Sequence, residues 1–390
     1  MKSKVVEAYK TESQEVYNKR FGVVFNGEDN LKPLIVENLI DSSPTALQCT
    51  WIYASFLGGG GFETDLSDIN LSENFWETTT PNDLLFEVCD PISRHQGVFV
   101  HVGYNANYEK DSYKVVPYTL CRVGKKDSKG YSGKVVVSPK GWGRSVKKEN
   151  IDVFDVYNPN PKVIQEQVDK VGGWDNYKGQ IFYFKLSNKY TYSKSLIETA
   201  YTYADSEHLM GQYYNNTIKR RFEDVDVIRH RAFPDKSSED AFYKNIKQVS
   251  GLENASSKLI VEDDWDDERE KNGNFRFDKL ESGGSPDKYE HIETVATNKI
   301  RKVYKTPPQL IDFIQGKLGN TSGEDLKTAQ AVYNSITARS RGRLEMFFKE
   351  LFRNYKEPIN TENNWTIKQY ALLKDGTVDS KNITNDSTDE

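Results

Sequence analysis

A helix, a pair of prolines, a short loop and a second, longer helix follow one another between residues 286 and 355. Pro286 occupies a first helical position, and apolar side chains then recur on one face at helical spacing. Pro307 and Pro308 end this helix, because proline lacks an amide donor and restricts the residue before it. Residues 321–325 form a capping-box pattern that begins the second helix. The pattern fits either a moving or channel-facing element or an ordinary helical hairpin in a core.

The loop between the two helices carries very little charge. Lys317 is the only charged residue between Asp312 and Glu324. The other residues that give the loop its polarity and flexibility are Gln315, Gly316, Gly319 and Asn320. In the second helix, Gly342 costs about 1 kcal/mol relative to alanine, so we predict a kink or break there.

Composition describes a polar chain with enough apolar material for a core. The 390 residues are 36% hydrophobic and 28% charged, with a net charge of -5, and suit two or three domains or one large mixed domain. No run approaches the roughly 18 apolar residues that span a bilayer, and the N-terminus leads into no apolar segment. We therefore expect a soluble protein made in a cytoplasm, with no membrane contact. The net acidity argues against wrapping nucleic acid, although it allows a local basic ring.

Motifs for metals, cofactors and catalysis are incomplete. Three cysteines are too few for a disulfide framework or a zinc site, so we expect buried reduced thiols. His95 and His101 lack a third ligand and are expected at the surface or in strand packing. The glycine run 58–61 is expected to end a helix and begin a flexible linker, because no Lys-Ser/Thr follows it. The acids at 262–270 lack EF-hand spacing. We predict no metal, no cofactor and no enzymatic activity.

Along the chain, the spacing of the apolar residues changes several times between a helical and a strand pattern. Residues 1–33 are polar with a weak helical pattern, and a helix from Pro44 follows. β-Branched and aromatic runs between residues 97 and 185 indicate a strand-rich body with one short helix. A long helical pattern covers residues 194–221, and an insertion of strands and a short helix ending at Gly251 follows.

Basic residues gather at three places along the helices. They are Lys219 to Arg221, then Lys299, Arg301 and Lys302, then Arg339, Arg341 and Arg343. The first group complements the dipole of its helix, or faces a polyanion. The other two groups lie either on a solvated or subunit-bridging face or against phosphates, and the sequence leaves both interpretations open.

These pieces together resemble the portal proteins of tailed bacteriophages over roughly residues 35–355. The most specific part is Tyr289 to Tyr304 followed by Lys305-Thr306-Pro307-Pro308-Gln309-Leu310-Ile311, which is similar to the family's second stem helix and the prolines before its tunnel loop. Gly319-Asn320-Thr321-Ser322 and the following helix resemble the tunnel loop and the helix behind it. Looser similarities are the helix after Ser43-Pro44, the lead-in Tyr192 to Ile197, and the clip-like insertion 222–284.

The resemblance implies an α+β portal-type fold with a strand-rich wing, long stem helices, an inserted α/β clip and a long C-terminal helix behind the tunnel loop. The implied divisions are arm 1–33, wing 34–193, first stem helix 194–221, clip 222–285, second stem helix 286–305, tunnel-loop region 306–323, long wing helix 324–357, and a short crown-like or disordered tail 358–390. The chain is short for a portal, and the arm has no counterpart in the family.

The resemblance also implies a function. The chain would form a homo-oligomeric ring, expected to be a dodecamer, at one capsid vertex of a virion assembled in the host cytoplasm. Double-stranded DNA would pass non-specifically through the ring during packaging and ejection. The implied partners are the terminase or packaging ATPase, the major capsid protein and a head–tail adaptor.

Site residues follow from the same resemblance. Pro307, Pro308, Gly316 and Gly319 would act as hinges of the tunnel loop, and Gln315, Lys317, Asn320, Lys299 and Lys302 would face the nucleic acid. One lysine per subunit gives a modest phosphate contact, whereas a basic channel would hold DNA. Two alternatives remain open: another head-completion or minor capsid protein without a channel, and a hydrolase that uses acids between Asp263 and Glu270.

Overall fold

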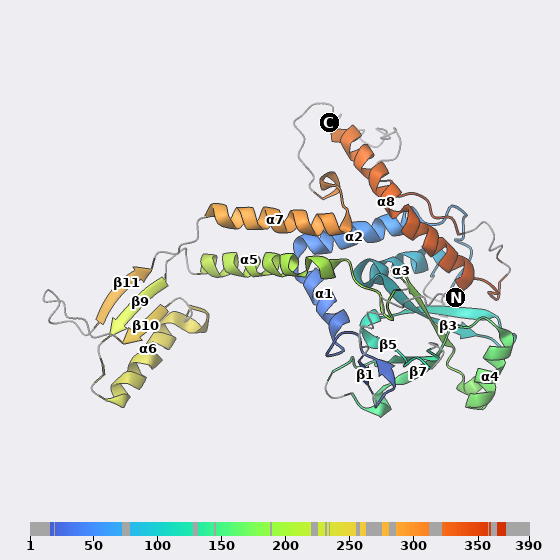
Figure 1. Cartoon of the computed structure of the whole chain (residues 1–390), viewed down its shortest axis with the longest axis horizontal. Coiled ribbons are helices and arrows are strands. Elements are labelled where there is room, and N and C mark those ends of the chain that lie inside the picture. Colours follow the sequence, from blue (N-terminus) through green and yellow to red (C-terminus); the bar gives the residue numbers. More distant parts are fainter. Residues whose placement is uncertain are drawn as a thin grey trace, which may run out of the picture. The chain divides into compact units, whose positions relative to one another are not determined.

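The computed structural model describes residues 16–18, 20–71, 79–127, 132–143, 146–187, 189–219, 225–230, 232–233, 235–254, 258–262, 275–280, 286–311, 322–357, 359 and 365–371. Internal contacts divide the chain into two units (Figure 1). The first consists of Met1–Ala204 and Lys299–Glu390, and the second of Asp205–Asn298. None of the described helices combines the length and the apolarity needed to cross a bilayer.

A six-stranded sheet forms the body of the first unit. Its order is β4-β3-β8-β7-β6-β5, and every neighbouring pair is antiparallel except β7 with β8. The strands are β3 (Gly97–Tyr104), β4 (Lys110–Val116), β5 (Cys121–Val123), β6 (Lys134–Val137), β7 (Asp152–Val156) and β8 (Gln180–Lys185). The sequence predicts strands at residues 97–104, 112–118, 134–138, 151–157 and 179–185. All strands but β5 correspond to these runs, and β3 has the predicted bounds.

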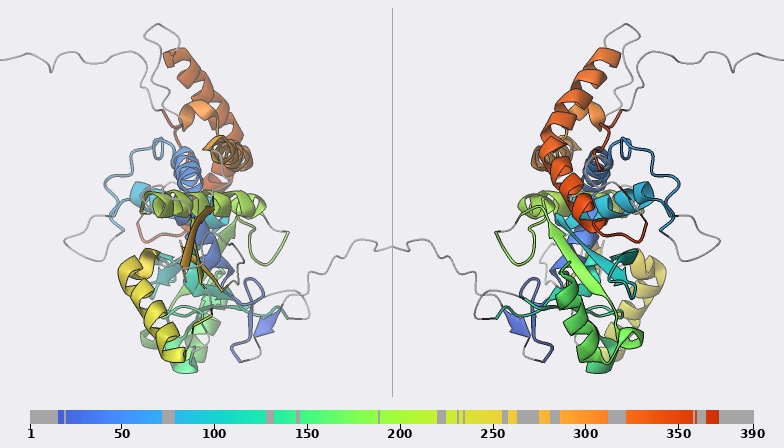
Figure 2. Two further views of the ribbon diagram at one scale, coloured as in Figure 1. Left: turned by 90° about the vertical axis from the view of Figure 1, so that its left-hand side faces the viewer. Right: turned by 90° about the vertical axis from the view of Figure 1, so that its right-hand side faces the viewer.

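Helix α3 and the C-terminal half of α8 cover one side of this sheet, and α2 packs on these two helices (Figures 1 and 2). Val98, Val100 and Val102 of β3 belong to the same buried cluster as residues of these helices. Phe99, on the opposite side of the strand, belongs to a second cluster with Tyr118 and Ile181. The alternation along β3 therefore places an apolar core on both faces of the sheet. The helices of this unit are α1 (Lys32–Ser42), α2 (Pro44–Gly58), α3 (Pro81–His95), α4 (Pro161–Val171) and α8 (Ser322–Leu351).

Helix α3 was not predicted from the sequence. Thr80 caps it by accepting a hydrogen bond from the Asp83 amide, while the Asp83 carboxylate accepts one from the Thr80 amide. This capping box, with Pro81 at the first helical position, is a sequence signal for a helix start. Pro91 lies inside the helix and is the residue that obscures the helical pattern.

The segment before α1 is part of the body rather than an arm. Strands β1 (Tyr17–Asn18) and β2 (Val23–Val24) pair antiparallel, so the weak helical pattern expected there is wrong. The turn between them contains Gly22 at φ 65°, a conformation that favours glycine. Arg122 is 1% exposed and its guanidinium donates to Asn30 Oδ1 at 2.5 Å and to the Asn30 carbonyl at 2.6 Å. These contacts fix the segment to the sheet. Residues 1–15 lie outside the described part of the chain.

The glycine run after α2 is a close-packing site and not a flexible linker. Helix α2 ends at Gly58, as predicted, and Gly59 has φ 56°. The Gly60 amide donates to the Lys368 carbonyl at 3.1 Å, and the Lys368 amide donates to the Gly61 carbonyl at 2.8 Å. A Cβ atom on Gly59 would lie 1.8 Å from the Lys368 carbonyl oxygen, so only glycine fits. Residues 365–371, expected in a crown-like or disordered tail, therefore belong to the packed core.

The second unit contains a three-stranded sheet and one helix of its own. The order is β10-β9-β11, with β9 parallel to β10 and antiparallel to β11. Phe242 of the helix packs against His230 and Phe233, with ring centroids 5.6 and 5.2 Å apart. The helix continues through Gly251, where the sequence predicted its end. The elements are β9 (Val225–His230), α6 (Lys236–Asn254), β10 (Lys258–Glu262) and β11 (Phe275–Leu280).

The boundaries between the units fall within two long helices. Helix α7 (Pro286–Tyr304) begins and ends within one residue of the predicted bounds. Helix α5 (Tyr201–Lys219) starts later than predicted, because a 3-10 turn at Ile197–Ala200 precedes it. Helix α8 runs through Gly342 without interruption, so a break there is excluded. The alternative, a kink at that glycine, stays a prediction.

Candidate functional site

The end of α7 is a defined capping structure. Lys305 adopts a left-handed conformation with φ 55°. Its amide donates to the Lys302 carbonyl at 3.3 Å, and the Thr306 amide donates to the Arg301 carbonyl at 3.1 Å. These two bonds form a Schellman motif, with lysine at the position usually occupied by glycine. The helix therefore ends at Tyr304, three residues before Pro307, and Pro308–Leu310 forms a 3-10 turn that leads into the loop.

A buried cluster fastens this segment to α2 and α8. The Thr50 hydroxyl of α2 donates to Tyr304 Oη at 2.8 Å. The Tyr333 hydroxyl of α8 donates to the Tyr304 carbonyl at 3.1 Å and accepts a hydrogen bond from the Thr306 hydroxyl at 3.3 Å. Burial raises the pKa of both tyrosines, so both phenols are neutral at physiological pH. We call Thr50, Tyr304, Thr306 and Tyr333 the loop anchor.

One further contact reaches the last described residue before the loop. Gln48 of α2 donates its side-chain amide to the Ile311 carbonyl at 3.0 Å. Gln315, Gly316, Lys317, Gly319 and Asn320 lie outside the described residues, so their predicted roles stay predictions. Pro307 is half-buried and Pro308 is exposed. The described part of the site thus fixes the segment from Tyr304 to Ile311, which leads into the candidate tunnel loop.

The other two candidate DNA contacts lie on α7. Lys299 and Lys302 are both exposed, while Ile300 and Tyr304 are buried on the opposite side of the helix. Exposure leaves their ammonium groups available for phosphate contacts. Whether they face nucleic acid stays a prediction.

The arginines of α8 have structural roles that the sequence did not reveal. Arg339 is exposed, but Arg341 is 5% exposed and binds the Phe56 carbonyl of α2 at 3.0 Å. Arg343 donates to the Lys185 carbonyl at 2.9 Å and to the Leu186 carbonyl at the end of β8. A solvated face is therefore wrong for Arg341, whose guanidinium caps carbonyl groups inside its own subunit.

The residues that could have formed other sites are accounted for by packing. All three cysteines are buried free thiols, as predicted. His95 is buried and stacks on Tyr118, and its Nε2 lies 3.1 Å from Glu37 Oε1. The Nε2 atom of His101, in β3, lies 2.6 Å from the Lys178 carbonyl oxygen. Within the described ranges, no group of three or more histidines, cysteines and acids is placed to bind a metal. Of the acids at 262–270, those after Glu262 lie outside these ranges.

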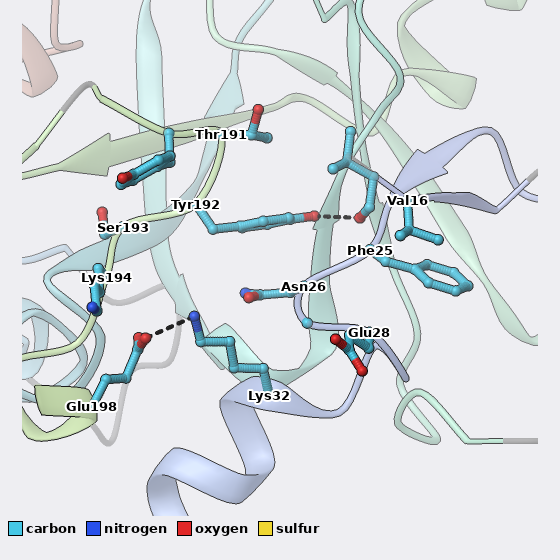
Figure 3. A pocket seen from close by; sticks show the side chains of 13 residues that line it. Val16, Phe25, Asn26, Glu28, Lys32, Thr191, Tyr192, Ser193, Lys194 and Glu198 are labelled. Atoms are coloured by element: carbon cyan, nitrogen blue, oxygen red, sulfur yellow. Dashed lines mark hydrogen bonds and ion pairs between the residues drawn. The ribbon is translucent and has the colours of Figure 1, made fainter. Parts of the chain in front are cut away.

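A surface cavity of about 430 Å³ lies away from the loop anchor, between residues 24–28 and 190–194 (Figure 3). Lys32 and Glu198 form an ion pair of 2.8 Å at its edge. Tyr192 spans the cavity wall and donates to the Val24 carbonyl at 2.8 Å. The labelled charges and hydroxyls of Figure 3 do not form a nucleophile–base pair. The ion pair and the Tyr192 hydrogen bond join the N-terminal segment to the lead-in to α5 at this cavity.

Comparison with known proteins identifies the fold. No protein-family model and no curated protein matches the sequence. A chain in the neck of an empty gene transfer agent (GTA) particle, computed with C6 symmetry, matches with a TM-score of 0.51 at 11% identity over 86% of this chain and 83% of that chain. A chain in the virion of a native GTA particle matches with a TM-score of 0.50 at 11% identity over 84% and 82%. The chain shares the fold of these GTA neck and virion chains.

The α+β class is thereby confirmed, and these matches to neck and virion chains agree with the portal resemblance at the level of the fold. A crystal structure of an HK97-family phage portal protein from Corynebacterium diphtheriae is less similar, with a TM-score of 0.40 at 8% identity over 74% of this chain and 83% of that chain. Within the first unit of this chain, the loop anchor joins α2, α7 and α8.

Proposed function

We propose that this chain is the subunit of a ring-shaped portal channel in a phage or phage-like particle. Double-stranded DNA passes through the ring during packaging and ejection. The ring occupies one vertex of the capsid, and its outer surfaces bind the packaging motor, the capsid shell and the head–tail adaptors. A dodecamer is the expected assembly. The chain is not an enzyme, and a partner ATPase supplies the energy for DNA movement.

The loop anchor is the observation that carries this proposal. Helix α7 ends in a buried hydrogen-bonded cluster with α2 and α8, and the residues between α7 and α8 are polar and nearly uncharged. Buried hydrogen bonds among Thr50, Tyr304 and Tyr333 hold the start of the loop region in a fixed position. A portal-type fold presents such a loop to the channel, so the fold and the anchor support the same role.

Charge also suits a conduit through which DNA must slide. Each phosphate that a protein neutralises adds affinity by releasing counterions. The chain has a net charge of -5, and Lys317 is the only charged residue between Asp312 and Glu324. One lysine from each subunit makes weak, sequence-independent phosphate contacts, and exposed Lys299 and Lys302 add to them on α7. DNA is therefore guided and not held.

A packaging assay tests the proposal. Particles are assembled without the chain, with the wild type, and with Lys317→Ala or Lys317→Glu, and nuclease-protected DNA per particle is measured. We expect no protected DNA without the chain, because there is no entry channel. Lys317→Glu is expected to lower the amount severalfold, since a ring of carboxylates repels phosphates, and Lys317→Ala less.

Lys140→Glu is the matched control, because it makes the same charge change on an exposed turn away from the loop. It is expected to package normally. Normal packaging by both Lys317 variants would remove that lysine from the mechanism. Normal packaging without the chain would contradict the channel itself.

A further inference from the structure

The C-terminal end of α8 is held by a buried lysine. Lys110 of β4 is 1% exposed. Its ammonium donates to Tyr157 Oη at 2.6 Å and to the Glu350 carbonyl in the last turn of α8 at 2.7 Å. A cation beside the carbonyl groups that end a helix is favoured by the helix dipole. The side chain of Lys110 thus joins the sheet to the last turn of α8.

Backbone hydrogen bonds join the same elements. The Lys110 amide donates to the Asn354 carbonyl at 2.9 Å, and the Lys356 amide donates to the Lys110 carbonyl at 3.0 Å. The Tyr113 hydroxyl donates to the Leu351 carbonyl at 2.9 Å. The chain therefore leaves α8 by pairing with β4 on both sides of Lys110. The Lys356 amide reports directly on this pairing.

Several titratable groups face Lys110 from the elements around it. The Glu350 carboxylate accepts a hydrogen bond from the Tyr157 hydroxyl at 3.0 Å and pairs with Arg353 at 3.6 Å. Burial has the largest effect on the pKa of Lys110 and lowers it. The Glu350 carboxylate raises this pKa, and the Arg353 guanidinium lowers it. Burial also raises the pKa values of Tyr104, Tyr113 and Tyr157, so these phenols stay neutral. The pKa of Lys110 is consequently lowered to about 7.

We propose that Lys110, Tyr157 and the last turn of α8 form a latch that fastens the helix to the sheet and opens more readily when Lys110 carries a proton. A neutral amine still donates to the Glu350 carbonyl and to Tyr157, so the closed latch keeps its hydrogen bonds. A protonated amine keeps them too, but its charge is buried with only partial compensation. Opening returns that charge to water.

The direction of the pH dependence follows from proton linkage. In the open latch the solvated amine has a pKa of about 10.4, and in the closed latch a pKa of about 7. The open state therefore binds more protons between these values, and rising pH closes the latch. The opening equilibrium is expected to fall by up to about tenfold for each pH unit from 7 to 10. Below pH 7 the amine is protonated in both states, and the equilibrium is constant.

Hydrogen exchange of the full-length protein tests the latch. Amide protection of residues 348–357, corrected for the intrinsic pH dependence of exchange, is measured from pH 6 to 9. Wild-type protection is expected to be constant below pH 7 and to rise by up to about tenfold per unit above it. Lys110→Met, which removes the titrating group, is expected to abolish the rise. Lys114→Met is the control, because Lys114 is an exposed residue of the same strand. This variant is expected to retain the rise in protection.

Tyr157→Phe provides a second variant that keeps the ring but removes the hydroxyl that binds Lys110. Loss of this acceptor weakens the closed protonated form, so the pH at which protection begins to rise is expected to move below 7. A rise that persists in Lys110→Met, a wild-type protein without any rise, or a Tyr157→Phe profile identical to the wild type would each overturn the latch. The latch groups named here belong to one subunit, so the test can succeed or fail whether or not the protein forms the proposed ring.

Discussion

Replacing Arg341 by methionine is expected to lower the free energy of unfolding by about 2–4 kcal/mol. The guanidinium donates to the Phe56 carbonyl at 3.0 Å, to the Asn334 carbonyl at 2.9 Å, to Asn334 Oδ1 at 2.9 Å and to Thr337 Oγ1 at 3.0 Å. Methionine fills the apolar part of the space but cannot donate. The Phe56 carbonyl of α2 and the oxygens of Asn334 and Thr337 in α8 then lose this buried donor, which costs more than the net contribution of an ordinary hydrogen bond.

Urea unfolding of the Arg341→Met variant measures this loss directly. Arg339→Met is the matched control, since Arg339 lies two residues earlier on the same helix and is exposed. The control is expected to change stability by less than about 0.5 kcal/mol. Equal effects of the two substitutions would mean that the contact between α2 and α8 does not depend on the buried guanidinium.

Replacing Phe348 by alanine is expected to cost about 3–5 kcal/mol, because it leaves a cavity in the main core. Phe348 is 0% exposed. Its ring centroid lies 5.2 Å from that of Phe62 after the glycine run and 6.2 Å from that of Trp365 in the C-terminal segment. The aromatic cluster therefore joins α8 to two segments that are distant in sequence. Its loss is expected to release residues 365–371 first, because Trp365 packs directly on Phe348.

Denaturant unfolding gives the size of the effect, and hydrogen exchange of residues 365–371 gives its location. Met346→Ala is the control from the same turn, with a side chain that is 72% exposed. It is expected to change stability by less than about 0.5 kcal/mol and to leave exchange unchanged. An effect of Phe348→Ala below about 1 kcal/mol would contradict its place in the core.

Features fixed by local chemistry were predictable from the sequence. Strand β3 shows β-branched residues at period two, and its bounds agree with the prediction. Helix α7 ends where its prolines require, although the left-handed residue that closes it is Lys305, which no pattern indicated. The capping signals at Thr80 and Asp83 are sufficient to predict the start of α3, although Pro91 interrupts its helical pattern.

Features fixed by distant contacts were not predictable. Thr50 and Tyr304 are 254 residues apart, so neither side chain carries a sign of the other. The glycine run was correctly expected to end a helix, but its close packing was not predictable because its partner, the backbone of Lys368, has no sequence signature. Arg341 did leave a signal, since it falls at helical spacing between buried Thr337 and Leu344. A basic residue on an apolar stripe predicts a buried cap better than a solvated face.

Electron microscopy of the purified full-length protein tests the proposed channel most directly. Portal subunits form closed rings, so the images are expected to show rings with a central hole wide enough for duplex DNA. The loop that follows Ile311 is expected to line that hole. A stable monomer, or an oligomer closed without a hole, would contradict the channel and favour a head-completion or minor capsid protein that binds the shell without conducting DNA.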